Sequence, residues 1–444
     1  MATAPGPSRS LLSLLSYRPA RDTLAFFTSL ARDYGDVVSV RMGPERAFLI
    51  NDPTLIRDVL VTNQRHYHKG RALERSKPLL GNGLLTSEDA DHVKRRRLLQ
   101  PAFHKDAIVS YAIAMVEYAD RARHRWEDGA TVDVAQEMMR LTLGIVGKTL
   151  FDADVESHAT DIGAALTDVL ESFWTMMLPF ADVLEHLPVP SLRRSRAARA
   201  RLDRLMYGMI ADRRKHPQHR GDLLSMLLLA QDEEEQGRRL TDVEVRDEAM
   251  TLFLAGHETT ANALSWMWFL VSGAPGVEGR MHEEIDRVLG GRLPTIADIP
   301  NLAYTEQVIT EAMRLYPPAW MIGRRAVGEQ GLGDYVLPNR ALVLVSPYVT
   351  QRDARHFSEP ERFVPERWTT EFKASLQPFV YFPFGGGSRR CIGESFAWME
   401  LILVASTIAQ RWTIRAQPGH PVVPQPLMTL RLKHGLRATI AARK

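Results

Sequence analysis

Cysteine is nearly absent from this chain, which has a single one, Cys391, among 444 residues. One cysteine excludes an internal disulfide bond, so the fold depends on its core and not on covalent cross-links. A chain without disulfides is typical of a reducing compartment, and we expect a cytoplasmic protein. Most free cysteines pack as small hydrophobic side chains, so the surroundings of Cys391 decide whether it does chemistry.

A long apolar run is missing as well. The apolar stretch at residues 11–17 is too short to cross a bilayer, which takes about 20 apolar residues. No cationic leader with a cleavage-like site is evident near it. We therefore expect no transmembrane anchor.

The sequence has no strong excess of either charge. It contains 56 Lys+Arg against 53 Asp+Glu, a formal net charge of +3, and its basic clusters are dispersed without a nucleic-acid reader motif. We expect no nucleic-acid partner. Linkers, repeats and low-complexity segments are also missing, and 45% of the residues are hydrophobic. These features predict a single domain over residues 1–444 with an ample core.

Helical periodicity dominates the middle of the chain. It predicts long helices over residues 108–126, 134–151, 162–177, 192–214 and 242–271. Alternating apolar residues predict a hairpin over 36–51 that turns at Gly43 and Pro44, and short strands near 335–337 and 341–347. Residues 422–436 resemble extended segments and turns. The expected class is mainly α (α+β), a helix-rich domain with small sheets.

The surroundings of Cys391 favour a thiolate. A flexible basic loop, Phe384-Gly-Gly-Gly-Ser-Arg-Arg, comes just before it, and a helical stretch follows. Helix-terminal amides and cations lower the pKa of a thiol, which favours its metal-binding form. Three glycines let the backbone approach a flat cofactor, and Arg389 offers a planar fork for a carboxylate.

The same loop carries a family signature. Phe384, Gly387, Arg389, Cys391 and Gly393 reproduce F-x-x-G-x-R-x-C-x-G, and by this motif the whole chain resembles the cytochrome P-450 superfamily. The resemblance implies the P-450 fold, with haem b between a distal helix and the thiolate loop, where Phe384 also lies. It implies that the Cys391 thiolate is the proximal ligand of the iron, an arrangement that favours O–O cleavage.

A polar patch interrupts the apolar helix predicted over 242–271. Residues 255–260 read Ala-Gly-His-Glu-Thr-Thr and match the A-G-x-[DE]-T-[ST] motif of the distal helix. The resemblance implies that Thr259 hydrogen-bonds dioxygen or a water beside it, and that Glu258 opens a proton path to bulk water. Glycine and threonine also make a local widening of the helix plausible. A solvent-facing polar stripe is the simpler alternative, while a zinc site fails because Ala261 replaces the second histidine of H-E-x-x-H.

Further charged residues match other family motifs. The resemblance implies that haem propionates are held by His92, Arg96, Arg324 and Arg389. It also implies a structural network of Glu311, Arg314 and Arg367 that fixes the loop leading to Cys391, because arginine forks satisfied by carboxylate and carbonyl groups hold a loop in place.

The resemblance places apolar side chains around the substrate. Residues 171–180 would form a lid, and the pocket would be lined by Phe173, Trp174, Met177, Leu252, Ala255, Ala319, Trp320, Met321 and Met428. This lining predicts a long or bulky hydrophobic substrate. The stretches 315–325 and 344–352 are most similar to bacterial carotenoid-ring hydroxylases, and related fatty-acid hydroxylases share much of that texture.

The leading hypothesis is a monooxygenase that inserts one oxygen atom from O2 into a C–H bond. No G-x-G-x-x-G unit indicates a built-in nicotinamide or flavin site, so we expect no fused reductase and a separate ferredoxin or flavodoxin with its reductase. Arg95, Arg389 and Arg390 would suit such an acidic carrier. Rearranging or peroxide-driven members typically lack the Glu258–Thr259 pair, and a non-catalytic haem sensor would need the thiolate loop but no proton relay.

Overall fold

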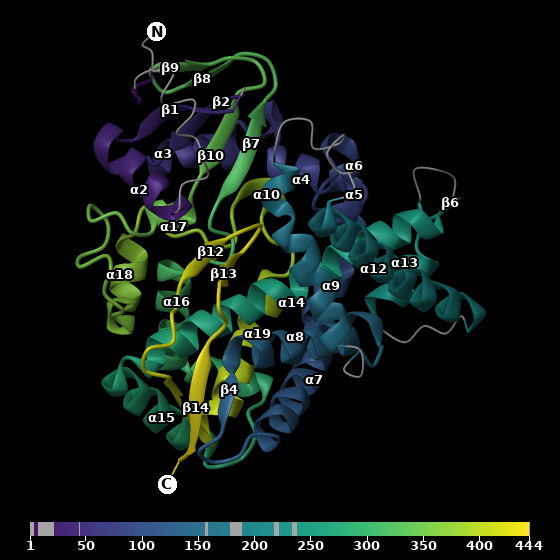
Figure 1. Cartoon of the computed structure of the whole chain (residues 1–444), viewed down its shortest axis with the longest axis vertical. Coiled ribbons are helices and arrows are strands. Elements are labelled where there is room, and N and C mark those ends of the chain that lie inside the picture. Colours follow the sequence, from purple (N-terminus) through teal and green to yellow (C-terminus); the bar gives the residue numbers. More distant parts are fainter. Residues whose placement is uncertain are drawn as a thin grey trace.

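The computed structural model describes residues 4–7, 22–43, 45–155, 159–177, 189–216, 222–232 and 238–443. Helices dominate, and the strands gather into small sheets (Figure 1). The predicted mainly α (α+β) class is therefore confirmed. The longer helices are α2 Thr23–Tyr34, α6 Asp89–Leu99, α7 Lys105–His124, α8 Val134–Phe151, α9 Ala159–Glu171, α12 Pro190–Lys215, α14 Asp242–Ser272, α15 Pro275–Leu289, α16 Ala303–Leu315 and α19 Glu394–Ala409.

Short helical turns connect these elements. The short α-helices are α3 Pro53–Arg57, α4 Arg71–Arg75, α5 Lys77–Leu80, α10 Phe173–Met176, α13 Leu223–Leu229, α17 Pro347–Thr350 and α18 Thr370–Ser375. Other helical turns are η1 Asp58–Thr62, η2 Gln64–His66, η3 Gln100–Phe103, η5 Ile296–Asn301, η6 Pro365–Arg367 and η7 Gly387–Arg389.

The largest sheet has five strands. Its order is β1 Val37–Met42, β2 Glu45–Ile50, β10 Leu342–Val345, β7 Ile322–Ala326 and β3 Tyr67–Lys69. β1 and β2 pair antiparallel, with Val37 opposite Ile50, which confirms the predicted hairpin; Pro44 in its turn lies outside the described residues. β10 runs parallel to β2 and antiparallel to β7.

The remaining strands form smaller sheets. β11 Trp412–Ala416, β14 Arg437–Ala442 and β4 Thr131–Asp133 make a three-stranded sheet. Three pairs complete the set: β12 Pro424–Pro426 with β13 Leu430–Leu432, β8 Gln330–Leu332 with β9 Tyr335–Leu337, and β5 Gln231–Asp232 with β6 Arg238–Arg239. The strands predicted near 335–337, 341–347 and 422–436 are therefore present.

Helix α14 crosses the middle of the molecule and packs against α8, α12, α16 and α19 (Figure 1). Its N-terminus is closed by a capping box, in which Thr241 and Glu244 satisfy each other's backbone N–H groups. Farther along, Phe253, Trp266 and Trp268 are almost completely buried. A helix that is buried all round belongs to the core of a large domain, so its polar patch at 255–260 lies inside the molecule.

One predicted helix is wrong. The expected helix over 162–177 ends as α9 at Glu171, and a separate turn, α10, begins at Phe173. Between them, the Ser172 hydroxyl donates to the Val169 carbonyl at 2.6 Å and lies 3.0 Å from the Ser195 hydroxyl of α12. A serine that bonds the preceding turn competes with the helix and redirects the chain.

No helix among the described residues is both long and apolar enough to cross a membrane. The two longest helices, α12 and α14, carry too many charged residues. Arginines recur along α12, and the first two turns of α14 carry Asp242, Glu244, Arg246 and Asp247.

Candidate active site

A cavity of about 1410 Å³ lies between α14, the loop before α19 and the five-stranded sheet. Every side chain predicted to line the substrate pocket lies on its wall: Phe173, Trp174, Met177, Leu252, Ala255, Ala319, Trp320, Met321 and Met428. They come from α10, α14, the segment before β7 and the turn between β12 and β13. The predicted lid at 171–180 is described only as far as residue 177. An apolar pocket with a few polar groups is the usual form of a small-molecule site.

Glycines shape the loop before Cys391 by letting it pack on its own chain. Gly385 and Gly387 have φ angles of +71° and +69°, in the left-handed region. A Cβ atom on Gly387 would lie 2.1 Å from the Leu60 carbonyl oxygen, and one on Gly386 would lie 2.5 Å from the Phe379 ring. A side chain at Gly386 or Gly387 would therefore overlap the protein itself, while the close approach of this loop to a flat cofactor stays a prediction.

The Cys391 side chain lies deep in the molecule but open to the cavity. It does not pack as a small hydrophobic residue. Burial raises the pKa of the Cys391 thiol to about 11, while a hydrogen bond from Gly393 N–H and the charges of Arg96 and Arg390 oppose that rise. The expectation that loop cations lower this pKa is wrong for the protein groups alone, because desolvation outweighs them. A metal ion on the sulfur would reverse the balance, since a coordinating thiol is deprotonated outright.

Two buried arginines face the cavity. Arg324 is only 6% exposed, and its Nη1 donates to the Gly323 carbonyl at 3.0 Å. Burial lowers the pKa of Arg324 to about 10, and the nearby charge of Arg389 adds to that effect. Arg389 Nη1 donates to the Tyr67 carbonyl at 2.5 Å, and its Nη2 pairs with Glu88 at 2.6 Å.

Lys69 joins these arginines, and sequence reasoning missed it. It is 4% exposed, lines the cavity and donates to the carbonyls of Leu84, at 2.8 Å, and Ser87. Burial lowers the pKa of Lys69 to about 7. Lys69 shares the inward face of β3 with Tyr67, where a lysine needs partners, but three residues are too few to predict a strand. Arg324 and Arg389, together with a partly protonated Lys69, leave surplus positive charge at the cavity, because Glu88 neutralises only one of these charges.

His92 and Arg96 lie on α6, behind this cluster. Burial lowers the pKa of His92 to about 4, and the charges of Lys69 and Arg389 lower it further, so its imidazole is neutral. Arg96 Nη1 donates to the Arg390 carbonyl at 2.7 Å, which ties α6 to the residue before Cys391. The structure thus brings both predicted residues to the thiolate loop without placing them on the cavity wall.

The polar patch of α14 faces the interior. His257 and Glu258 are each 2% exposed, so the alternative of a solvent-facing stripe is wrong. Thr259 lines the cavity, and its Oγ1 donates to the Ala255 carbonyl at 2.8 Å. The helix continues as α-helix through all six residues, so the expected widening is not seen.

Glu258 is held by residues that sequence reasoning missed. Its Oε1 accepts from Thr429 Oγ1 at 2.5 Å and from Arg431 Nε at 2.8 Å, and its Oε2 accepts from Arg431 Nη2 at 3.1 Å. The carboxylate therefore lies between the cavity and Arg431 and does not open directly onto bulk solvent. Residues 429 and 431 are 171 and 173 positions farther along the chain, and no local pattern links them to Glu258.

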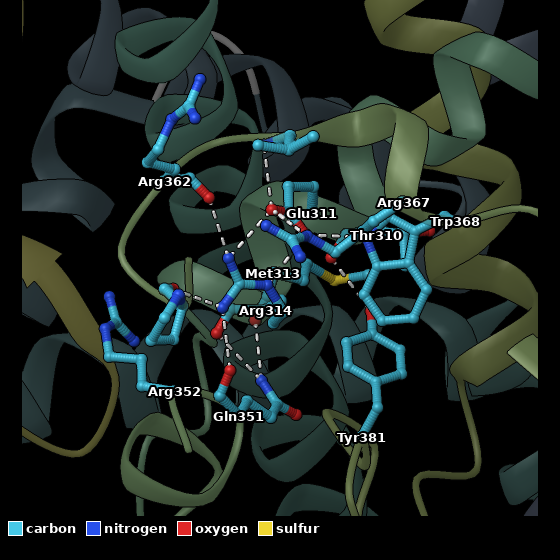
Figure 2. Close-up of polar contacts among 12 residues, drawn as sticks. Thr310, Glu311, Met313, Arg314, Gln351, Arg352, Arg362, Arg367, Trp368 and Tyr381 are labelled. Atoms are coloured by element: carbon cyan, nitrogen blue, oxygen red, sulfur yellow. Dashed lines mark hydrogen bonds and ion pairs between the residues drawn. The ribbon is translucent and has the colours of Figure 1, made fainter. Parts of the chain in front are cut away.

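Figure 2 shows Glu311 and Arg314 facing each other at the centre of a buried network. Both side chains are 0% exposed, and two parallel bonds of 2.8 and 2.9 Å join them. Arg367 Nε donates to Glu311 at 3.0 Å, so the structure brings together the three residues named from the sequence. The Trp368 indole adds another bond to Glu311 at 2.8 Å.

Gln351 connects this network to the thiolate loop. Its carbonyl accepts from Arg314 Nη1 at 2.9 Å, and its side-chain Oε1 accepts from the Phe382 N–H at 3.1 Å (Figure 2 shows the first contact). Phe382 begins the turn that continues through Gly385. Gln351 therefore links the buried ion pair to the start of the loop, through its backbone carbonyl on one side and its side-chain amide on the other.

The arginines expected to meet an acidic electron carrier are mostly not on the surface. Arg95 is 12% exposed and paired with Glu248, and Arg389 is 10% exposed. Arg390 alone of these three is open, with a side chain 58% exposed. That expectation is wrong for Arg95 and Arg389, because their ion pairs with Glu248 and Glu88 hold both side chains inside the fold.

A family model described as Cytochrome P450 matches residues 4–437, and the chain belongs to this family. It is 43% identical to cyclooctatin synthase of Streptomyces melanosporofaciens over 413 residues, 93% of this chain and 90% of that protein. It is 39% identical to cyclooctat-9-en-7-ol 5-monooxygenase of the same organism over 420 residues, 94% of this chain and 90% of that protein. Its fold matches the crystal structure of the cytochrome P450DA heme domain with a TM-score of 0.88 at 26% identity, covering 100% and 98% of the two chains.

The protein is a cytochrome P450 monooxygenase that uses haem b, needs O2 and a redox partner, and acts on hydrophobic compounds. The residues present fit this cofactor. A thiol open to the floor of a deep cavity could ligate its iron, and the surplus cations at Lys69, Arg324 and Arg389 could neutralise its two propionates.

Proposed function

We propose that this cytochrome P450 hydroxylates a cyclic terpenoid, either a hydrocarbon or an alcohol. The observation that carries the proposal is the apolar cavity of about 1410 Å³, whose wall includes both Cys391 and Thr259. Two relatives with more than a third of their residues identical are named for cyclooctatin and cyclooctat-9-en-7-ol. Bulky walls such as Phe173, Trp174 and Trp320 suit a compact ring system, which gains affinity from buried apolar area.

Each predicted residue has a place in this proposal. Bound haem supplies the centre at which O2 is activated and one oxygen atom is transferred. Cys391 is the thiolate ligand, and Phe384 lies beside it on the cavity wall. Lys69, Arg324 and Arg389 would hold the propionates, and His92 and Arg96 would support that cluster from α6.

Proton delivery falls to α14. The Thr259 hydroxyl lies on the cavity wall and would deliver protons into the cavity, and Glu258, on the same wall, would relay protons to it. The apolar walls keep bulk water away from the reacting C–H bond, which limits side reactions.

Electrons reach the haem from a ferredoxin or a flavodoxin with its reductase. The exposed Arg390 beside the thiolate loop supplies one cation for such an acidic carrier. A cytoplasmic location and a single domain over residues 1–444 remain predictions.

A second candidate substrate is a fatty acid. Arg41 and Arg46, from β1 and β2, also line the cavity, where they could hold a carboxylate. Sequence reasoning found no such arginine among the predicted pocket residues. A carotenoid ring, the substrate class suggested by resemblance, is a third candidate that no contact in the cavity favours over the first two.

Ligand titration separates the candidates. The reduced protein with carbon monoxide should give the Soret band of a haem-thiolate centre. A panel of cyclic terpenoid hydrocarbons, terpenoid alcohols, β-carotene and long-chain fatty acids is then titrated, and the shift in haem spin state and the products are recorded. We expect saturable shifts and hydroxylated product from cyclic terpenoids. Product from fatty acids only, abolished by Arg46→Ala, would replace the terpenoid proposal with the fatty-acid one.

A further inference from the structure

The hairpin β12–β13 is anchored rigidly beside the active site. The Trp320 indole donates to the Leu427 carbonyl at 2.8 Å, and the Trp266 indole donates to the Leu430 carbonyl at 2.9 Å. The Leu430 N–H donates in turn to the Pro318 carbonyl at 2.9 Å. The backbone of this hairpin is therefore held in place. A side chain that positions another group needs such a fixed backbone.

Arg431 of this hairpin forms a buried, two-point contact with Glu258. The Arg431 side chain is 13% exposed and that of Glu258 is 3% exposed. The two nitrogens of Arg431 engage both carboxylate oxygens, so the contact fixes the orientation of Glu258 as well as its place. Thr429 adds its hydroxyl to the same carboxylate and accepts a bond of 3.2 Å from Asn262 Nδ2.

Arg431 also reaches the helix that leads to the substrate. Its third nitrogen, Nη1, lies 3.4 Å from Thr167 Oγ1 on α9. Helix α9 ends at Glu171, and Ser172 connects it to α10, which carries Phe173 and Trp174 to the cavity wall. One guanidinium thus contacts both the acid of α14 and the helix next to the substrate-contacting turn.

We propose that Arg431 is a positioning residue for proton delivery, which fixes the Glu258 carboxylate at the cavity wall and links its orientation to α9. This inference rests on the proposed roles of Glu258 and Thr259. Without the guanidinium, the Glu258 carboxylate keeps Thr429 as its neighbour but loses the contacts that fix both its oxygens. The acid then turns away from the geometry in which it can supply Thr259.

The first test compares Arg431→Met with Arg431→Lys. We expect Arg431→Met to keep the haem-thiolate spectrum and the substrate dissociation constant read by spin shift. Product per nicotinamide consumed should fall about tenfold, with peroxide and the solvent deuterium isotope effect rising, because the proton donor is misplaced but present. Arg431→Lys should recover much of the loss. Lys433→Met, which removes an exposed cation two residues farther along, is the matched control and should behave as wild type.

Unchanged coupling and isotope effect in Arg431→Met would overturn the inference, as would a Lys433→Met variant that uncouples equally. If Arg431→Met does not hold haem, Thr167→Val carries the test, because it removes only the contact between Arg431 and α9. Thr167→Val should uncouple at unchanged substrate affinity, and wild-type coupling in this variant refutes the proposal. Thr259→Ala separates this inference from the proposed function: if it stays coupled, the relay itself is wrong, and if it uncouples while the Arg431 variants do not, only the role of Arg431 fails.

Discussion

Cys391 lies inside the fold, but its side chain is exposed to the cavity. Burial raises the pKa of the free thiol, so ionisation depends on the positive charge of a bound metal. Cys391→Ser puts a neutral hydroxyl at the same place. We expect this variant to lose the haem-thiolate Soret band in the carbon monoxide difference spectrum and to lose monooxygenase activity, with far-UV circular dichroism showing that it folds. A retained thiolate-type spectrum would refute the assignment of Cys391.

Thr259 differs from Cys391 because its hydroxyl is not needed to hold the cofactor. It donates to the Ala255 carbonyl of its own helix, and its substitution leaves that helix intact. Thr259→Ala should therefore keep haem and substrate affinity while diverting electrons to peroxide, with a loss of about 100-fold in the productive step. The measurement is product formed per nicotinamide consumed, with peroxide quantified in parallel. Thr259→Ser keeps a hydroxyl and should stay largely coupled. Equal coupling in the wild type, Thr259→Ala and Thr259→Ser would mean that the proton relay lies elsewhere.

Among the structural elements, the thiolate loop is the one whose shape depends most on backbone conformation. Gly385 and Gly387 both have left-handed φ angles, which cost an alanine about 1 kcal/mol. They differ in their neighbours, because a Cβ on Gly387 overlaps the Leu60 carbonyl at 2.1 Å while one on Gly385 meets only Ile322 at 3.7 Å.

Alanine substitutions at Gly385 and Gly387 separate the effect of backbone strain from that of steric overlap with Leu60. We expect Gly387→Ala to yield little protein with bound haem, because the loop must move off η1, whereas Gly385→Ala lowers the melting temperature only slightly. The checks are the haem-to-protein absorbance ratio and thermal unfolding. Equal haem content in the two variants would show that the contact with Leu60 does not fix the loop.

The elements also show what local sequence can predict. Apolar periodicity gave helix α8 at its observed bounds and α14 to within one residue, since both are long and buried. It failed between α9 and α10, where the helical pattern continues through residue 177. A single hydroxyl, Ser172, ends the helix there through contacts with Val169 and with Ser195 of another helix. Such a partner is invisible in a window of neighbouring residues.

In the whole molecule, the same limit of local sequence patterns separates the site residues that were predicted from those that were missed. Motifs located Cys391 and Thr259, because their spacing within short segments is distinctive. Arg431 escaped prediction because its partner Glu258 lies 173 positions away, on α14. Lys69 escaped prediction because the carbonyls that hold it, those of Leu84 and Ser87, lie 15 and 18 positions farther along the chain. Their chemistry arises only when the fold brings separate segments together.

The Glu311 network is the clearest case in which one contact supports the whole molecule. Arg314 binds Glu311 and the carbonyls of Gln351, Pro360 and Arg362, and so joins α16 to the chain that leads to Cys391. Removing either partner leaves a completely buried charge, at a cost of about 3–5 kcal/mol. We expect Arg314→Ala and Glu311→Ala to give little protein with bound haem.

An exposed pair of the same spacing provides the control for this prediction. Arg362 and Glu359 also lie three residues apart, but their side chains are 68% and 57% exposed. Solvent screens such a pair to about 0–1 kcal/mol, so Arg362→Ala should retain haem and melt close to wild type. Haem content is read from the Soret-to-protein absorbance ratio, and stability from thermal unfolding. If Arg314→Ala and Arg362→Ala behave alike, the buried ion pair does not hold the thiolate loop, and the glycine contacts with η1 are left to fix it.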